Sequence, residues 1–95
     1  MSARERPEEL VPVGHTVRRT EAYHAHRRDQ WGRGWSDRER DNFKRWERDA
    51  RAERWVVAAH LAPGTEHNRS YGYAYELHQG LRVMYSLRFD WEADK

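Results

Sequence analysis

Four residues near the C-terminus carry the side chains that acid–base cleavage of RNA requires. Glu76 could take the proton from a ribose 2′-hydroxyl, and His78 could protonate the leaving oxygen. Arg82 and Arg88 could hold the phosphate. The same alternation is what the polar face of any half-exposed strand shows, so a small sheet-based ribonuclease is our last alternative. Apart from that alternative, the sequence predicts no catalytic residue.

A second cluster lies in "HRRDQWGRGW", where Arg27, Arg28 and Arg33 flank Trp31 and Trp35. Arginines beside aromatic rings on a glycine-containing loop could stack on unpaired bases of RNA or DNA. The same residue types are also enriched at protein–protein hot spots. A surface loop with one or both tryptophans tucked into the core is the simpler structural interpretation, and we favour it over base stacking.

The six histidines do not form a metal motif. No two of them have the i,i+4 spacing, with a glutamate beside them, that marks a zinc site on a helix. The chain has no cysteine, which excludes disulfides, thiolate zinc sites and a cysteine nucleophile. We therefore expect neither a metal nor a cofactor.

The charge pattern argues against a nucleic-acid-binding protein of the usual basic kind. Lys and Arg number 18 and Asp and Glu number 16, which leaves a formal net charge of only +2. The basic residues are interleaved with acidic ones along the whole chain, so no segment forms a basic stripe. Binding of single-stranded nucleic acid by residues 27–35 is therefore the alternative, and another protein is the expected partner.

At 95 residues, the chain predicts one small α+β domain, in which a helix packs on an antiparallel sheet. Residues 1–12 form a polar arm in this interpretation, and residues 13–95 form the domain. "SDRE" places Ser36 as N-cap and Glu39 three residues later, the spacing of a capping box. The helix starts there and ends near residue 54 or continues to residue 61. If the helix ends near residue 54, "WVVAAHL" is a buried strand. The longer helix, which continues to residue 61, is slightly favoured.

Residues 71–91 predict a hairpin, because apolar and aromatic side chains occupy almost every odd position. Directly opposite residues of an antiparallel pair share a face, so this parity predicts a three-residue loop that ends at Gly80. Leu77 would then face Leu81, and Glu76 would face Arg82. A third strand is expected from residues 55–61 or from the N-terminal third, where residues 15–26 fit a strand or a short helix.

The N-terminal residues have no apolar segment, so we expect no secretory signal. The apolar stretch "WVVAAHLAPGT" is too short to cross a bilayer. We expect a cytoplasmic, non-catalytic protein that binds another protein, for example a phage- or plasmid-borne inhibitor, and we leave its oligomeric state open. The residues predicted to contact the partner are Trp31, Arg33, Trp35, Arg27, Arg28 and Trp91. The residues predicted to form the core are Phe43, Trp46, Tyr73 and Tyr85.

Overall fold

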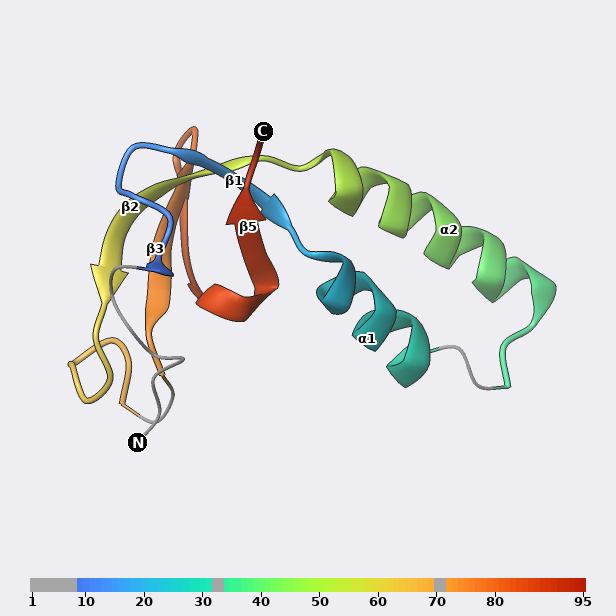
Figure 1. Ribbon diagram of the computed structural model, residues 1–95. Helices are drawn as coiled ribbons and strands as arrows, with labels where there is room; N and C mark the ends of the chain where they lie inside the picture. The colour runs from blue at the N-terminus through green and yellow to red at the C-terminus, as the bar shows by residue number, and fades with distance from the viewer. Residues whose placement is uncertain (1–8, 32–33, 70–71) are drawn as a thin grey trace.

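An antiparallel sheet of five strands forms one half of the molecule, and a pair of helices inserted between its first two strands forms the other (Figure 1). The computed structural model describes residues 9–31, 34–69 and 72–95. This architecture confirms the predicted α+β class. In chain order the elements are β1 (Thr16–Arg19), α1 (Glu21–Trp31), α2 (Asp37–Ala52), β2 (Trp55–Leu61), β3 (Ala74–Gln79), β4 (Arg82–Leu87), the 3₁₀ helix η3 (Arg88–Asp90) and β5 (Trp91–Ala93).

The strand order across the sheet is β4-β3-β2-β1-β5, so β4 and β5 are the two edges. The short η3 joins these edges, and the sheet curves enough to bring them together. The indole Nε1 of Trp91 on β5 donates a hydrogen bond of 2.7 Å to the hydroxyl of Ser86 on β4. The concave side of the sheet is therefore closed around the core.

The core comes from the sheet and from the segment before β1. Its buried members are Leu10, Val17, Trp55, Val57, Tyr75, Leu77 and Trp91. Leu10 is inside this cluster, and the backbone N–H of Val11 donates to the hydroxyl of Tyr75 at 2.8 Å. Residues 10 and 11, which were predicted to be part of a polar arm, therefore belong to the folded domain.

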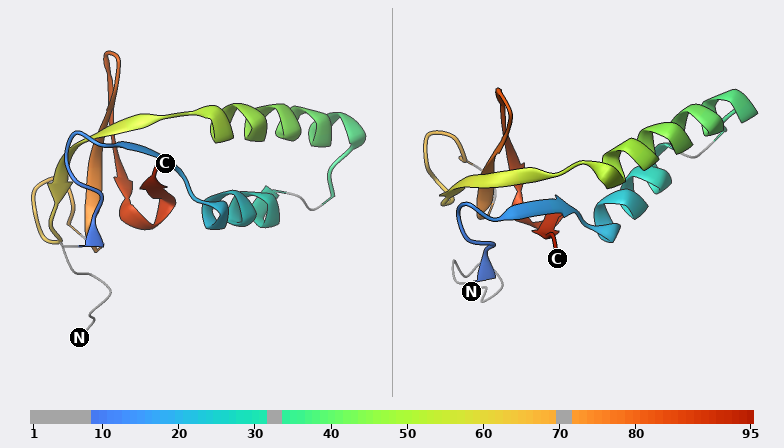
Figure 2. Two further views of the ribbon diagram at one scale, coloured as in Figure 1. Left: turned by 45° about the horizontal axis from the view of Figure 1, so that its top comes forward. Right: turned by 90° about the horizontal axis from the view of Figure 1, so that it is seen from above.

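The two helices form a hairpin that projects from the sheet, and both turned views show them side by side (Figure 2). The hairpin meets the sheet at its base, where α2 contacts β1 and α1 contacts η3. The predicted capping box is present: Ser36 accepts a hydrogen bond from the Glu39 backbone N–H, and the Glu39 carboxylate accepts one from the Ser36 N–H. The start of this helix is therefore confirmed.

Residues 55–61 are a strand, so the favoured helical interpretation of this segment was wrong. The helix ends at Ala52, and Glu53 has an extended backbone with φ −68° and ψ 135°. Trp55 and Val57 then point into the core, while β2 pairs with both β1 and β3. Residues 15–26 contain both expected elements in succession, because β1 ends at Arg19 and α1 begins at Glu21.

The hairpin β3–β4 exists, but its predicted register was wrong. Gln79 pairs with Arg82, Leu77 with Met84, and Glu76 with Tyr85, so the turn has two residues, Gly80 and Leu81. Gly80 has φ 57° at the first turn position, as a type II′ turn requires.

This register sends the odd-numbered apolar residues of β4 outward. Met84 packs against the core, and Ser86 bonds to the indole of Trp91 that crosses from the other edge. The concave face of β4 is thus partly polar. Tyr85, predicted to be buried, is 49% exposed and stacks on His67 of the loop before β3.

The other residues predicted to form the core differ in how far they are buried. Phe43 is buried as predicted, whereas Trp46 is 39% exposed and Tyr73 is partly buried against the core. Trp91, expected to contact a partner, is 3% exposed. Trp46 is exposed because α2 packs against α1 rather than over the sheet. Trp91 is buried because β5 carries it into the space that a helix was expected to fill.

Candidate functional site

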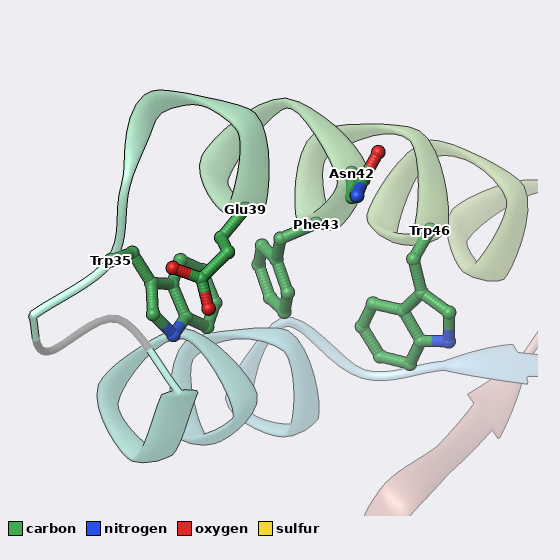
Figure 3. A pocket seen from close by; sticks show the side chains of 5 residues that line it. All are labelled: Trp35, Glu39, Asn42, Phe43 and Trp46. Atoms are coloured by element: carbon green, nitrogen blue, oxygen red, sulfur yellow. The ribbon is translucent and has the colours of Figure 1, made fainter.

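A groove on the helical hairpin combines aromatic rings with a carboxylate (Figure 3). Its volume is about 330 Å³. The residues that line it are Trp35, Glu39, Asn42, Phe43 and Trp46. The side chains of Trp35, Glu39, Phe43 and Trp46 point from α2 and the residue before its cap toward α1, whereas that of Asn42 points away from α1.

The spacing of these residues follows from helical geometry. Residues 39, 42, 43 and 46 recur at intervals of three and four, which places them on one face of α2. Trp35 folds back over this face: its ring centroid is 4.9 Å from that of Phe43, which in turn is 5.3 Å from that of Trp46. The result is a row of three rings along the groove.

Glu39 supplies the charge in this groove. Its carboxylate accepts the Ser36 backbone hydrogen bond at 2.9 Å, and the hydrogen bonds with the backbone and side chain of Ser36 lower the pKa of this carboxyl. The group is therefore ionised at neutral pH. Within the described residues, no basic side chain forms an ion pair with it. The groove thus holds a negative charge beside three aromatic rings.

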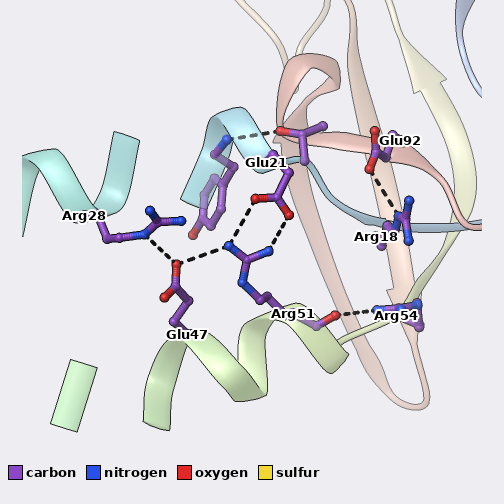
Figure 4. Close-up of polar contacts among 9 residues, drawn as sticks. Arg18, Glu21, Arg28, Glu47, Arg51, Arg54 and Glu92 are labelled. Atoms are coloured by element: carbon purple, nitrogen blue, oxygen red, sulfur yellow. Dashed lines mark hydrogen bonds and ion pairs between the residues drawn. The ribbon is translucent and has the colours of Figure 1, made fainter. Parts of the chain in front are cut away.

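An ion-pair network holds the two helices at a fixed separation (Figure 4). Glu47 on α2 accepts from Arg28 at 2.9 Å and from Arg51 at 3.5 Å. The two terminal nitrogens of the Arg51 guanidinium, Nη1 and Nη2, also donate to the carboxylate of Glu21 at the start of α1, which lowers the pKa of Glu21. Four charged residues therefore form one network, two of them on α1 (Glu21 and Arg28) and two on α2 (Glu47 and Arg51).

His24 lies on α1 behind this network and is 1% exposed. Burial lowers the pKa of His24, and the nearby Arg51 acts in the same direction. Its Nδ1 has no hydrogen-bond partner. The imidazole is therefore neutral at pH 7, and its ring packs edge-to-face against that of Tyr23, with 5.5 Å between the ring centroids.

Arg19 ties the hairpin to the sheet. Its guanidinium carbon lies 4.2 Å from the ring centroid of Tyr23 on α1 and 4.2 Å from that of Trp91 on β5. Such cation–π contacts are worth about 0.5–2 kcal/mol each, depending on solvent exposure. The base of the hairpin is thus fixed, and the groove has a defined position relative to the sheet.

The described residues of the predicted loop cluster divide between the groove and contacts within the hairpin. Trp35 lines the groove, but Arg27 donates to the hydroxyl of Tyr23 at 3.1 Å and Arg28 is paired with Glu47. The side chain of Trp31 and the whole of Arg33 lie outside the described part of the chain. Arg27 and Arg28 therefore act within the hairpin.

The four residues of the ribonuclease alternative lie on two faces of the sheet. The register places Glu76 and His78 on the convex face, with Tyr85 and Val83 opposite them. Arg82 lies on the concave face, with its guanidinium 5.3 Å from the Trp55 ring, and the Arg88 guanidinium approaches Glu9 at 3.8 Å. The acid–base pair therefore has neither arginine beside it.

In residues 9–31, 34–69 and 72–95, no three His, Asp or Glu side chains are placed to hold a metal ion together. None of the described helices has the length and apolar character that a transmembrane segment needs.

Sequence reasoning missed Glu39 and Asn42 as lining residues and assigned Phe43 and Trp46 to the core. Their i, i+3, i+4, i+7 spacing was the available signal, but it marks a shared face without saying what covers that face. The chain matches no known protein-family model, and comparison with curated proteins and with solved structures finds no significant match.

Proposed function

We propose that this chain is a small, non-catalytic intracellular binding protein, an inhibitor or regulator, that docks on another protein through the groove of its helical hairpin. The observation that carries the proposal is the row of Trp35, Phe43 and Trp46 beside the ionised Glu39. Tryptophan is among the residue types most enriched at binding hot spots. The helical hairpin that carries the row projects from the sheet (Figure 2).

The chemistry of the groove favours a partner that inserts a basic side chain. An arginine or lysine can lie on the aromatic faces and pair with the carboxylate of Glu39. A purely apolar anchor would take water from that carboxylate and give it no partner, which costs free energy. The chain already uses the same contact internally, at Arg19 between two rings.

The contacts around the groove speak against nucleic acid as the partner. A phosphate at this position would meet the negative charge of Glu39, and Arg28 is engaged with Glu47. A protein is therefore the proposed partner, and nucleic acid is the alternative.

The test is affinity capture from nuclease-treated lysate, with the wild type, a Trp46→Ala variant and a Val13→Ala variant as baits. Val13 is exposed and lies outside the groove, so its variant is the matched control. We expect one protein to be retained by the wild type and the control and to be lost with Trp46→Ala. Circular dichroism checks that all three baits are folded.

Equal capture by the Trp46→Ala bait would contradict the groove as the docking site. Fluorescence anisotropy with labelled single-stranded RNA and duplex DNA completes the test. Affinity that falls steeply between about 50 and 200 mM salt would identify a nucleic-acid binder instead.

A further inference from the structure

The outer edge of the sheet carries an unusual set of exposed apolar side chains. Leu81 is 102% exposed, Val83 52%, Tyr85 49% and Phe89 51%, and all four lie on β4 or directly beside it. They account for four of the seven large hydrophobic side chains that are exposed in the described chain. Val83 and Tyr85 are on β4, Leu81 is in the turn before it and Phe89 is in η3 after it, so this concentration along one edge of the sheet marks an interaction surface.

The backbone of β4 is also available along this edge. Arg82 closes the two-residue turn and pairs with Gln79, so hydrogen-bonded and non-hydrogen-bonded positions alternate from there. Val83, Tyr85 and Leu87 accordingly direct their N–H and C=O groups away from β3. No backbone hydrogen bond from another described segment reaches these groups. β4 has no proline, no lysine and no bulge, the usual protections of an edge strand.

We infer that this edge pairs with β4 of a second copy of the chain, antiparallel and about a two-fold axis through Met84. Residues that face each other must lie on the same side of the joined sheet, so the residue numbers of each pair must have an even sum. The axis at Met84 places Val83 beside Tyr85 of the second copy and Leu81 beside Leu87 of the second copy. Each exposed apolar side chain of the strand thus gains an apolar neighbour.

Charge favours this register over the register whose two-fold axis passes through Tyr85. With the axis at Met84, Arg82 faces Ser86 of the second copy. With the axis at Tyr85, Arg82 would face Arg88 of the second copy, and like charges directly opposite each other are destabilising. An isologous pair of this kind closes on itself and gives a dimer with one continuous ten-stranded sheet.

The pairing is independent of the proposed function, because the groove lies on the helical hairpin and β4 lies at the far edge of the sheet. A variant that disrupts one surface leaves the other unchanged. The two proposals can therefore succeed or fail separately.

The absence of cysteine gives a direct test of the register. In a Met84→Cys variant the two thiols face each other across the axis, at a non-hydrogen-bonded pair with a Cα separation of about 4.5 Å. This distance allows a disulfide, which diamide forms by taking two electrons and two protons from the thiols. In the matched Val83→Cys variant the two residues are diagonal neighbours about 7–8 Å apart, too far for easy bridging.

We expect Met84→Cys to give a covalent dimer on a non-reducing gel at least tenfold faster than Val83→Cys. Equal rates for the two variants, or faster dimer formation by Val83→Cys, would overturn the register. Light scattering gives the second readout, because a single Met84→Cys failure could reflect poor thiol geometry. The wild type should approach twice the 11.5 kDa chain mass as concentration rises. Val83→Lys should remain at the chain mass and Val13→Lys should behave as the wild type; a wild type that stays monomeric up to millimolar concentration would overturn the pairing itself.

Discussion

Leucines at positions 77 and 81 provide the sharpest test of how the hairpin is folded. Leu77 is 0% exposed in the core, whereas Leu81 is 102% exposed in the turn, although the pattern of the sequence predicts that they face each other. The same substitution at both positions therefore separates the two registers. Leu77→Ala removes buried methyl groups and leaves a cavity, which costs about 2–5 kcal/mol. Leu81→Ala removes only exposed surface and should change stability by less than about 0.5 kcal/mol.

The assay is thermal unfolding followed by tryptophan fluorescence, at a concentration where the chain is monomeric. For a domain of this size each kcal/mol corresponds to about 4–8 °C in melting temperature, so Leu77→Ala should melt at least about 8 °C below the wild type. A Leu77→Ala chain that does not fold at all is the extreme of the same result. Comparable losses at both positions would refute the two-residue turn and restore the three-residue loop.

Three further predictions follow from individual residues. Burial lowers the pKa of His24, so the unfolded chain binds a proton first and stability should fall as pH drops below about 6.5; His24→Phe should remove this part of the pH dependence of the melting temperature between pH 7.5 and 5.5. Gly80→Ala should lower the free energy of unfolding in urea by about 1–2 kcal/mol, because φ is 57° at Gly80. Gln79→Ala is the comparison on the adjacent strand residue: it should lower that free energy only through the lost side-chain hydrogen bond to the Arg54 carbonyl, without a backbone penalty. Asn68→Ala should cost about 1–3 kcal/mol, because its buried amide bonds the carbonyls of Leu61 and Gly72; an unchanged unfolding midpoint would contradict that role.

Local signals in the sequence predicted the elements that depend on local interactions. Ser36 and Glu39 predicted the start of α2 correctly because a capping box is made within four residues. The alternation in residues 71–91 predicted a hairpin for the same reason. Its register could not be predicted, because alternation shows that residues share a face but not which face is buried. That choice depends on Trp91, which reaches Ser86 from the opposite edge of the sheet.

Residue spacing also could not predict where α2 ends or that a groove forms, because both depend on which elements pack against it. Val57 continues the helical spacing of Phe43 and Ala50, yet it is a core residue of β2 because β3 and β1 pair on either side of it. Trp46 has the spacing of a core residue as well. It lines a groove because α2 lies against α1 and not across the sheet.

The central claim is that the groove receives a basic side chain beside Glu39, and a Glu39→Gln variant tests it most directly. Glutamine at this position can keep the capping hydrogen bond to Ser36, so the substitution removes the charge and preserves the helix. Calorimetric titration of the captured partner should show at least fivefold weaker binding to Glu39→Gln at about 50 mM salt, and a smaller difference at high salt, where charges are screened. Equal affinity of the two chains at low salt would contradict the claim.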